Sequence, residues 1–267
     1  MKLTNEQIER YSRQIILKEV GGKGQEKLLN SKILVIGAGG LGSPALLYLA
    51  SAGVGTIGIV DGDKVDITNL QRQVIHFTED VNKEKIYSAK EKIEKINPDV
   101  KVITYNTRVN ASNIREIIRE FDFIIDGTDN FPAKFLINDA CFFEKKPFSH
   151  GGILRFQGQT LTYLPENACY RCIFDTPPPK GLVPTCSEAG IIGVMAGLLG
   201  VIQASEAIKY ILSTGQLLTN KLLFIDLLNL EFRTINFKRN KNCPLCGENP
   251  TIRDLIDYEA AVCDIKN

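Results

Sequence analysis

The sequence predicts an α/β fold: a Rossmann-like doubly wound sheet with a parallel N-terminal part, antiparallel C-terminal strands and a four-cysteine zinc site. Three features indicate this. An apolar run at residues 33–36 is followed directly by a G-x-G-x-x-G fingerprint at residues 37–42. Helix and strand patterns alternate as far as residue 150 and then change to short strands. Two Cys-x-x-Cys pairs lie in the second half of the chain.

We expect the 267 residues to form a single domain with four parts. These are an N-terminal helical arm at 1–31, a nucleotide-binding part at 32–150, a part with antiparallel strands, a loop and the zinc site at 151–246, and a C-terminal tail at 247–267. With 44% hydrophobic residues, a chain of this length can bury a full core.

The first half of the chain alternates between the two periodicities. In the arm, Ile8, Tyr11, Ile15 and Ile16 recur at helical intervals, and a second short helix is expected to end at Leu29. The strands expected next are 33–36, 57–60, 100–105, 123–125 and one near Phe148, and the expected helices are one that follows residue 42, then 83–96, 112–120 and 131–144. This alternation is typical of a parallel sheet with helices on both faces.

The pattern changes after the glycines at 151–152. Segments 153–156 and 158–163 have the alternation of antiparallel strands. Residues 175–181 are rich in proline and are expected to form neither helix nor strand, and such loops in compact domains are usually functional or disordered. An apolar helix with spaced glycines is expected at 190–213, followed by strands at 221–226 and 231–236.

The fingerprint and the residues after it predict a nucleotide site. Glycines allow backbone N–H groups to approach a phosphate at a helix N-terminus. Asp61, at the end of the second strand, is placed to accept hydrogen bonds from ribose hydroxyls. Residues 69–73 add a guanidinium and amide side chains, which are suited to hold a polyphosphate.

Charge and hydropathy argue against several kinds of partner. A net charge of +1 gives no electrostatic basis for binding nucleic acid or an anionic membrane. The apolar stretch at 191–202 is shorter than the roughly 18 residues of a membrane span, so a buried helix is expected there. Residues 1–6 contain no apolar signal segment, and a cytoplasmic location is therefore expected.

The seven cysteines favour metal binding or thiol chemistry over a disulfide framework. Two pairs with zinc-knuckle spacing complete a tetrahedral site of four thiolates, and a redox role for one pair is the alternative. The ligands are Cys169, Cys172, Cys243 and Cys246. Because the pairs are far apart in sequence, zinc would hold the C-terminal segment against the body of the protein. The other cysteines are Cys141, which is expected in the core, Cys186 and Cys263.

The motifs, taken in order, resemble those of the ThiF/MoeB/HesA family of adenylyltransferases, the bacterial relatives of ubiquitin-activating enzymes. The resemblance is carried by residues 10–14 (RYSRQ), 37–42, 69–73 (NLQRQ), 128–130 (TDN), 185–190 (TCSEAG) and the two cysteine pairs. Such enzymes bind ATP and adenylate the C-terminal glycine of a ubiquitin-like sulfur-carrier protein, releasing pyrophosphate. The resemblance therefore implies carrier adenylation for sulfur transfer in thiamin, molybdopterin or tRNA thiolation pathways.

The resemblance also implies a set of site residues. Nucleotide binding is implied for Gly37, Gly39, Gly40, Gly42, Asp61, Asn69, Arg72, Gln73, Lys85 and Asp129. Catalysis is implied for Arg13, Arg72, Lys85, Asp129 and Cys186. In the reaction a carboxylate approaches the α-phosphate while pyrophosphate leaves, so fixed positive charge is required. Arg72 offers a rigid fork and Lys85 a point charge, and both suit phosphates.

The implied cofactors are ATP, Mg²⁺ and Zn²⁺. Asp129 follows strand 123–125, where ligands collect at the carboxyl ends of parallel strands, and the resemblance implies that it holds Mg²⁺. Arg13 is implied to reach the site of a partner subunit in a homodimer. Cys186 lies in a segment implied to cross over the active site. It is interpreted either as a thiol that forms a covalent intermediate with the carrier or as a partly buried small hydrophobe.

The implied partners are a ubiquitin-like sulfur carrier with a C-terminal Gly-Gly and a second copy of the chain. Residues 250–260 resemble the segment that leads, in longer relatives, into a rhodanese sulfurtransferase domain. We therefore expect any sulfur to come from a separate sulfurtransferase or cysteine desulfurase.

Several site residues have simpler explanations. Arg72 and Lys85 could be solvated surface charges, and Asp129 could be the N-cap of helix 131–144. Asp63 is interpreted as a loop cap.

The substrate carboxylate is already ionised at neutral pH, so no general base is required. His76 and His150 are therefore interpreted as structural. Two other functions remain open. One is an NAD-dependent oxidoreductase, which the fingerprint alone would allow, and the other is a non-catalytic partner-binding scaffold of the same fold.

Overall fold

The computed structural model describes residues 3–179, 182 and 186–258. An eight-stranded sheet in the order β3-β2-β1-β4-β5-β6-β7-β8 runs through the molecule. The first five strands are parallel, and the last three extend the sheet in antiparallel fashion. The strands are β1 (Lys32–Ile36), β2 (Thr56–Val60), β3 (Lys101–Tyr105), β4 (Phe123–Asp126), β5 (Phe148–Leu154), β6 (Gln157–Tyr163), β7 (Lys221–Asp226) and β8 (Glu231–Asn236). The predicted fold class is confirmed.

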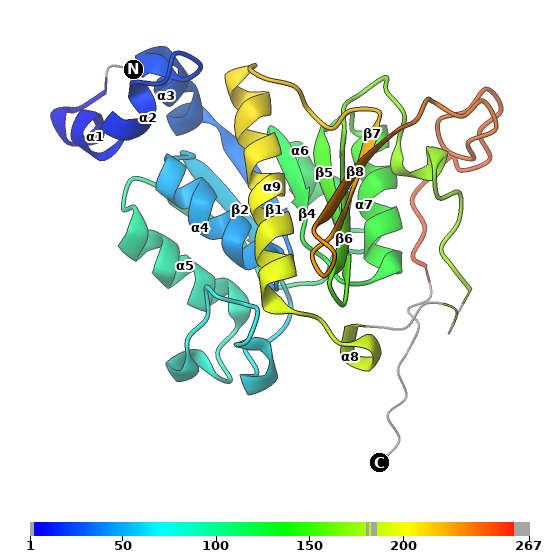
Figure 1. The fold of residues 1–267 in the computed structure, drawn as a ribbon, viewed down its shortest axis with the longest axis horizontal. Coiled ribbons are helices and arrows are strands. Elements are labelled where there is room, and N and C mark those ends of the chain that lie inside the picture. The colour runs from blue at the N-terminus through cyan, green and yellow to red at the C-terminus, as the bar shows by residue number, and fades with distance from the viewer. Residues whose placement is uncertain (1–2, 180–181, 183–185, 259–267) are drawn as a thin grey trace.

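Helices cover both faces of the sheet (Figure 1). The helices are α1 (Asn5–Arg10), α2 (Ser12–Ile15), α3 (Gly21–Asn30), α4 (Gly42–Ala52), α5 (Lys85–Ile96), α6 (Ile114–Arg119), α7 (Phe131–Phe143), α8 (Cys186–Ala189) and α9 (Gly193–Leu212). Three 3₁₀ turns, Ile67–Asn69, Thr78–Asp80 and Tyr170–Cys172, lie in the connections. The layers follow from the strands, because Ile33 and Val35 of β1 pack with α4, α5 and α9, whereas Leu34 and Ile36 pack with α6 and α7.

The strand order reverses between β1 and β4, which lie side by side in the middle of the parallel part. In an open α/β sheet, ligands bind outside the carboxyl ends of the strands at this reversal. The loops that follow β1 and β4 therefore mark the expected position of a site.

The change from parallel to antiparallel pairing occurs within one strand. β5 pairs with β4 through residues 148–150 and with β6 along its whole length. The separate strand expected at 153–156 was wrong, because residues 153–154 are the end of β5 and residues 155–156 form the turn into β6. Gly151 does not end the strand. A Cβ at Gly151 would lie 2.8 Å from Oε1 of Gln203, so this glycine allows α9 to approach the sheet closely.

The N-terminal arm begins with two short helices, α1 and α2, which precede α3, and most of the apolar face predicted for this first part is not buried. Tyr11, at their junction, is 2% exposed, and its hydroxyl accepts a hydrogen bond from Nδ2 of Asn97 at 2.8 Å. Ile8 and Ile16 are exposed. The arm lies at the end of the molecule opposite to α8 (Figure 1).

α9 (Gly193–Leu212) lies within the helix expected at 190–213 and extends beyond the apolar stretch at 191–202. With 20 residues and a mean hydropathy of 1.3, it is long and apolar enough to cross a membrane by length and composition alone. It packs along the sheet, however, and its buried face includes Gln203 and Glu206. Oε2 of Glu206 accepts hydrogen bonds from Thr162 Oγ1 at 2.6 Å and from the amide of Leu218 at 2.7 Å. A buried carboxylate that is hydrogen-bonded in this way is typical of the core helix of a globular domain.

Candidate functional site

The glycine fingerprint forms the turn from β1 into α4, at the reversal of strand order. Gly37 has a φ of +96°, and a Cβ there would lie 2.7 Å from the carbonyl oxygen of Gly127, which follows β4. A Cβ at Gly42 would lie 1.8 Å from the carbonyl oxygen of Gly37. These two glycines are therefore required by the packing of the chain against itself, and not only by the approach of a phosphate.

Asp61 fixes this loop from the end of β2. Its Oδ2 accepts a hydrogen bond from the amide of Ala38 at 2.8 Å, and its Oδ1 accepts one from the amide of Asp63 at 2.8 Å. Burial raises the pKa of Asp61, and the positive charge of Lys85 opposes that rise. Asp61 thus fixes the conformation of the fingerprint loop. The sequence predicted only a contact with ribose and not this role.

Arg72 and Gln73 lie beside the loop. A Cβ at Gly40 would be 3.5 Å from Cγ of Arg72, and one at Gly39 would be 3.6 Å from Nε2 of Gln73. The guanidinium of Arg72 donates to the carbonyl oxygen of Thr68 at 3.0 Å. Gln73 is 4% exposed, and its Oε1 has no hydrogen-bond partner among the described residues.

Asn69 builds the turn that carries these two side chains. Its carbonyl oxygen accepts hydrogen bonds from the amides of Arg72 at 3.1 Å and Gln73 at 2.9 Å. α9 begins against the same turn, because a Cβ at Gly193 would lie 2.3 Å from the carbonyl oxygen of Gln71. Several elements therefore fix the backbone that presents Arg72.

Lys85 is not a solvated surface charge. It is 6% exposed, and its Nζ lies 3.3 Å from Oδ2 of Asp63. Oδ1 of the same carboxylate accepts a hydrogen bond from Arg108 at 2.8 Å. The interpretation of Asp63 as no more than a loop cap was wrong. Asp63 contacts both Lys85 and Arg108, and Arg108 lies 45 positions after Asp63 in the sequence, outside any local pattern.

Arg108 is a residue that the sequence did not identify. A hydrogen bond from its guanidinium to Asp63 raises its pKa, and the charges of Asp61 and Asp129 raise it further. The electrostatic effect of all three carboxylates on one guanidinium indicates that the ends of β2 and β4 share one polar region.

His76 is a buried side chain that contacts the backbone of the fingerprint loop. Its Nε2 lies 2.9 Å from the carbonyl oxygen of Ala38, and its Nδ1 lies 2.8 Å from Oγ of Ser88 on α5. Burial lowers the pKa of His76 to about 4. A neutral ring that donates from Nε2 and accepts at Nδ1 satisfies both contacts. This arrangement supports the structural interpretation of His76.

Asp129 lies at the carboxyl end of β4. Asn130 is the N-cap of α7, because its Oδ1 accepts a hydrogen bond from the amide of Ala133 at 2.9 Å. The alternative in which Asp129 caps this helix was wrong. The Asp129 carboxylate is exposed and lies 3.5 Å from Nδ2 of Asn130, so capping does not use it.

A buried polar network lies beneath the Asp129 loop, and no sequence pattern predicted it. Asp126, at the end of β4, is fully buried, and its Oδ2 is 3.1 Å from Nζ of Lys134 and 3.0 Å from Nδ1 of His150. Burial alone would raise the pKa of Asp126, but the charge of Lys134 and the hydrogen bond from His150 outweigh it and lower the pKa to about 2. His150 is buried and contacts Asp126, which supports its interpretation as structural.

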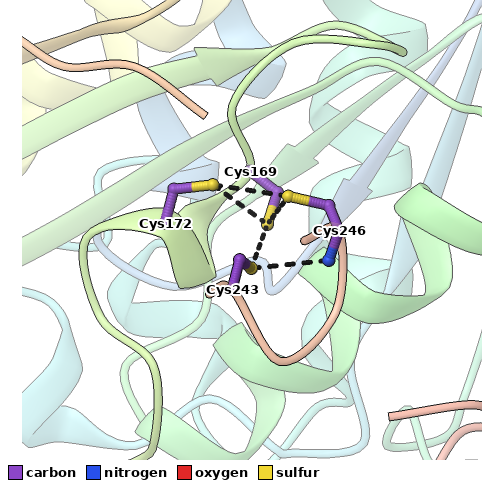
Figure 2. A group of neighbouring side chains, drawn as sticks. All are labelled: Cys169, Cys172, Cys243 and Cys246. Carbon is purple, nitrogen blue, oxygen red and sulfur yellow. Dashed lines mark hydrogen bonds between the residues drawn. The ribbon is translucent and has the colours of Figure 1, made fainter. Parts of the chain in front are cut away.

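The four predicted metal ligands come together in the structure (Figure 2). The sulfur atoms of the cluster formed by Cys169, Cys172, Cys243 and Cys246 all lie within 4.8 Å of one another. Measured contacts are 3.7 Å for Cys169–Cys243, 3.5 Å for Cys169–Cys246 and 3.4 Å for Cys172–Cys246. A tetrahedron with Zn–S bonds of about 2.3 Å has edges of about 3.8 Å, so this donor set fits zinc.

Arg171, between two of these cysteines, ties the cluster to the rest of the molecule. Its Nε and Nη2 donate to the two carboxylate oxygens of Asp139 on α7, at 2.7 and 2.8 Å. It also donates to the hydroxyl of Tyr258 in the tail and to the carbonyl oxygen of Asp175 at the start of the proline-rich loop. Arg171 is 2% exposed, so this junction is part of the core.

Arg13 lies far from the fingerprint loop of its own chain. Its helix α2 is held at the opposite end of α4, where Nε2 of Gln14 donates to the carbonyl oxygen of Ala52 at 2.9 Å. Arg13 itself is exposed. The geometry therefore does not bring Arg13 into the site within one chain.

The remaining predicted residues fall in or near parts that are not described. Cys186 is the first residue of α8, and its side chain lies outside the described part of the structure, as does Cys263. Cys141 is buried in the core, as expected.

Comparison with known proteins identifies related sequences of nearly equal length. The model of the ThiF family matches residues 11–245. The chain is 44% identical over 266 residues to the sulfur carrier protein adenylyltransferase of Thermus thermophilus, covering 97% of this chain and 98% of that protein. It is 46% identical over 260 residues to the SAMP-activating enzyme E1 of Haloferax volcanii, covering 97% and 96%.

A longer relative and a solved structure extend these findings. The chain is 43% identical to the probable adenylyltransferase/sulfurtransferase MoeZ of Mycobacterium tuberculosis over 262 residues, and it spans 65% of that protein. Among solved structures, E. coli MccB with AMPCPP and MccA has a TM-score of 0.79 at 24% identity, covering 92% of this chain and 75% of that chain. At this identity the structural match shows a shared fold.

Proposed function

The chain belongs to the ThiF family, and from this premise we propose that it is an ATP-dependent adenylyltransferase acting on a ubiquitin-like sulfur-carrier protein. The carrier's C-terminal glycine carboxylate would attack the α-phosphorus of ATP. A bond from carboxylate oxygen to phosphorus forms, the bond to the bridging oxygen breaks, and pyrophosphate leaves with its electrons. The products are an acyl-adenylate and pyrophosphate, and the former is the activated carrier needed for sulfur transfer.

The observation that supports this function best is the set of charged groups around the fingerprint loop. Two anions meet in the reaction and a third departs, so its barrier depends on fixed positive charge in place before the substrates arrive. Arg72 lies against Gly40, and Lys85 is buried beside Asp63 and Asp61. An NAD-dependent oxidoreductase breaks no phosphate bond and therefore does not require cations at a reacting phosphate. A scaffold would not need to bury a lysine at the site.

Asp129 is proposed to hold Mg²⁺. The donor fits, because the carboxylate is exposed at the carboxyl end of β4 and is not used as a helix cap. Magnesium bound there would neutralise phosphate charge, and it needs only one or two protein carboxylates besides phosphate oxygens. Asp61 would hold the ribose while it also fixes the loop.

The metal of the four-cysteine cluster is proposed to be zinc, in a structural role. Four thiolates in a tetrahedron leave no open position for a substrate. The cluster joins the segment around residue 170 to the segment around residue 245, which are far apart in the sequence.

We further propose that the active form is a homodimer in which Arg13 acts in the partner's site. The arm holds Arg13 away from the fingerprint loop of its own chain, so any contribution to catalysis must come from another copy. Large apolar side chains are exposed on α4, α5 and the segment between β2 and α5, where a second copy could cover them. These are Tyr48, Ile67, Val74, Phe77 and Tyr87.

Sulfur is proposed to come from a separate protein, a sulfurtransferase or a cysteine desulfurase. The described chain provides residues for activating a carboxylate, and its buried Cys141 is not placed to carry sulfur. A cytoplasmic location would suit a chain that relies on reduced thiolates for its metal cluster.

Carrier-dependent exchange of radiolabelled pyrophosphate into ATP tests the function. We expect exchange with one member of a panel of purified carriers that end in Gly-Gly, and none with the same carrier lacking its final glycine. Titration with NAD in place of ATP should show no binding. Saturable NAD binding together with no exchange for any carrier would overturn the proposal.

A further inference from the structure

We propose that Lys134 is a positioning residue that fixes the loop carrying Asp129, so that the carboxylate is held in place before magnesium and ATP arrive. This inference rests on the proposed function, because it concerns the proposed magnesium ligand. It assigns a role in the reaction to a buried network on the far side of the loop from the substrates. The network consists of Asp126, Thr128, Lys134 and His150.

The ammonium group of Lys134 is fully occupied by the loop and its neighbours. Its Nζ lies 3.1 Å from Oδ2 of Asp126 and 2.7 Å from the carbonyl oxygen of Thr128, and it also donates to the carbonyl oxygen of Gly151. An ammonium group has three N–H donors, and these contacts use all of them. Lys134 is 6% exposed, so these three contacts replace the water molecules that its ammonium group loses on burial.

These contacts fix the peptide from which Asp129 projects. The amide of Thr128 donates to Oδ1 of Asp126 at 3.0 Å, and its hydroxyl donates to the same oxygen at 2.6 Å. Lys134 binds the carbonyl of Thr128, which belongs to the peptide group joining Thr128 to Asp129. Thr128, immediately before Asp129, is therefore held at its backbone amide, its side-chain hydroxyl and its backbone carbonyl.

The two ends of the network are anchored in rigid elements. Asp126 ends β4, Lys134 lies in the first turns of α7, and His150 lies in β5 and reaches Asp126 at 3.0 Å. Gln203 of α9 donates to the carbonyl oxygen of Asp126 at 2.8 Å. Groups that orient a metal ligand from behind typically change metal affinity by about 10- to 100-fold when removed.

The test compares Lys134→Met with Lys146→Met. Nζ of Lys146 also binds two backbone carbonyls, those of Arg119 at 2.7 Å and Phe121 at 2.8 Å, but at the opposite end of the sheet. In Lys134→Met we expect the Mg²⁺ concentration for half-maximal pyrophosphate exchange to rise by about tenfold or more. In Lys146→Met it should equal that of wild type, even if the melting temperature falls.

Hydrogen–deuterium exchange of the protein without ATP or Mg²⁺ gives a readout independent of activity. The peptide covering 127–130 should exchange faster in Lys134→Met than in wild type and unchanged in Lys146→Met. If Lys134→Met does not fold, the test uses Thr128→Val, which removes the hydrogen bond from the hydroxyl to Asp126. This variant should also raise the Mg²⁺ concentration for half-maximal exchange and speed deuterium exchange at 127–130. Wild-type exchange of this peptide together with a wild-type Mg²⁺ dependence would overturn the inference.

Asp129→Ala in the same assay separates failure of this inference from failure of the proposed function. If Asp129→Ala abolishes exchange and Lys134→Met leaves the Mg²⁺ dependence unchanged, the function stands and the positioning role of Lys134 fails. If the wild-type protein catalyses no exchange, the proposed function fails, and deuterium exchange at 127–130 still shows whether Lys134 fixes the loop.

Discussion

Two regions of the molecule differ in which polar side chains remain exposed. One is the four-cysteine cluster, and the other is the region around the fingerprint loop. In the cluster, the four sulfur atoms face one another within 4.8 Å, and three of the four cysteines are buried. Around the fingerprint loop, Asp126, Lys134 and Asp63 are paired within the protein, while the carboxylate of Asp129, three residues after Asp126, is exposed.

The difference separates a site that holds the fold together from a site prepared for chemistry. With the proposed metal bound, the four thiolates would leave no open coordination position, so loss of the metal should lower stability. The loop region uses paired buried groups to hold the backbone and leaves a few charges available, so removal of those charges should cost activity. Each of the following predictions tests whether this division holds.

The largest effect is expected at Asp129. Asp129→Ala and Arg72→Ala should each lower carrier-dependent pyrophosphate exchange by at least about a hundredfold, because each removes charge at the reacting phosphates. The melting temperature should stay close to that of wild type. Asp122→Ala is the matched control, since that carboxylate lies at the other end of β4 and accepts a hydrogen bond from the amide of Lys32. Exchange within tenfold of wild type for Asp129→Ala or Arg72→Ala would contradict the assignment.

The opposite pattern is expected for Cys243→Ser. Purified wild-type protein should contain about one zinc per chain, and the variant should lose the metal and melt about 10 °C or more below wild type. Elemental analysis and thermal melts measure the two effects. Cys141→Ala, at a buried thiol outside the cluster, should keep its zinc. Anaerobically prepared wild-type protein without zinc would refute the metal assignment.

An intermediate effect is expected at His76, whose protonation should make the free energy of unfolding depend on pH. Its pKa in the folded protein, about 4, lies below the ordinary value of 6.5. The stability it contributes is therefore present above pH 6.5 and is lost as the pH falls toward 4, because the unfolded chain binds the proton more tightly. The loss amounts to about 3 kcal/mol at pH 4.

Denaturant unfolding at several pH values measures this contribution. In His76→Gln the free energy of unfolding should fall less steeply between pH 6.5 and 4 than in wild type. Equal slopes in the two proteins would show that His76 is not held neutral by the loop.

The next prediction concerns mixed dimers of two inactive variants, whose activity should be about a quarter of that of wild type. Arg13→Ala and Asp129→Ala homodimers should each be inactive, whereas a mixed dimer has one complete site if Arg13 acts across the interface. Random re-pairing should restore about a quarter of wild-type activity. If subunit exchange is demonstrated and activity stays at the level of the separate variants, Arg13 does not act in the partner's site.

The smallest effect on adenylation is expected for Cys186→Ala. Pyrophosphate exchange should persist, because the proposed adenylation step uses no thiol, while any covalent adduct between enzyme and carrier should disappear. Mass spectrometry under non-reducing conditions measures the adduct. An adduct that survives in the variant would place the thiol chemistry at another residue.

Short-range patterns carried most of what the sequence predicted. The apolar run before Gly37 and the helical repeat after it give β1 and α4, and the spacing within each cysteine pair is itself a ligand geometry. The network of Asp126, Lys134 and His150 was not predictable in this way. Its members lie in three different elements, and each is an ordinary residue until the sheet brings them together. Arg108 was missed for the same reason.

The guanidinium of Arg171 has a consequence for how the molecule opens. It contacts α7 through Asp139, the tail through Tyr258 and the root of the proline-rich loop through the carbonyl of Asp175. Segments that share one buried junction open together as a cooperative unit. Release of the metal, proteolytic cleavage of the tail and loosening of the loop's root should therefore report one and the same opening free energy.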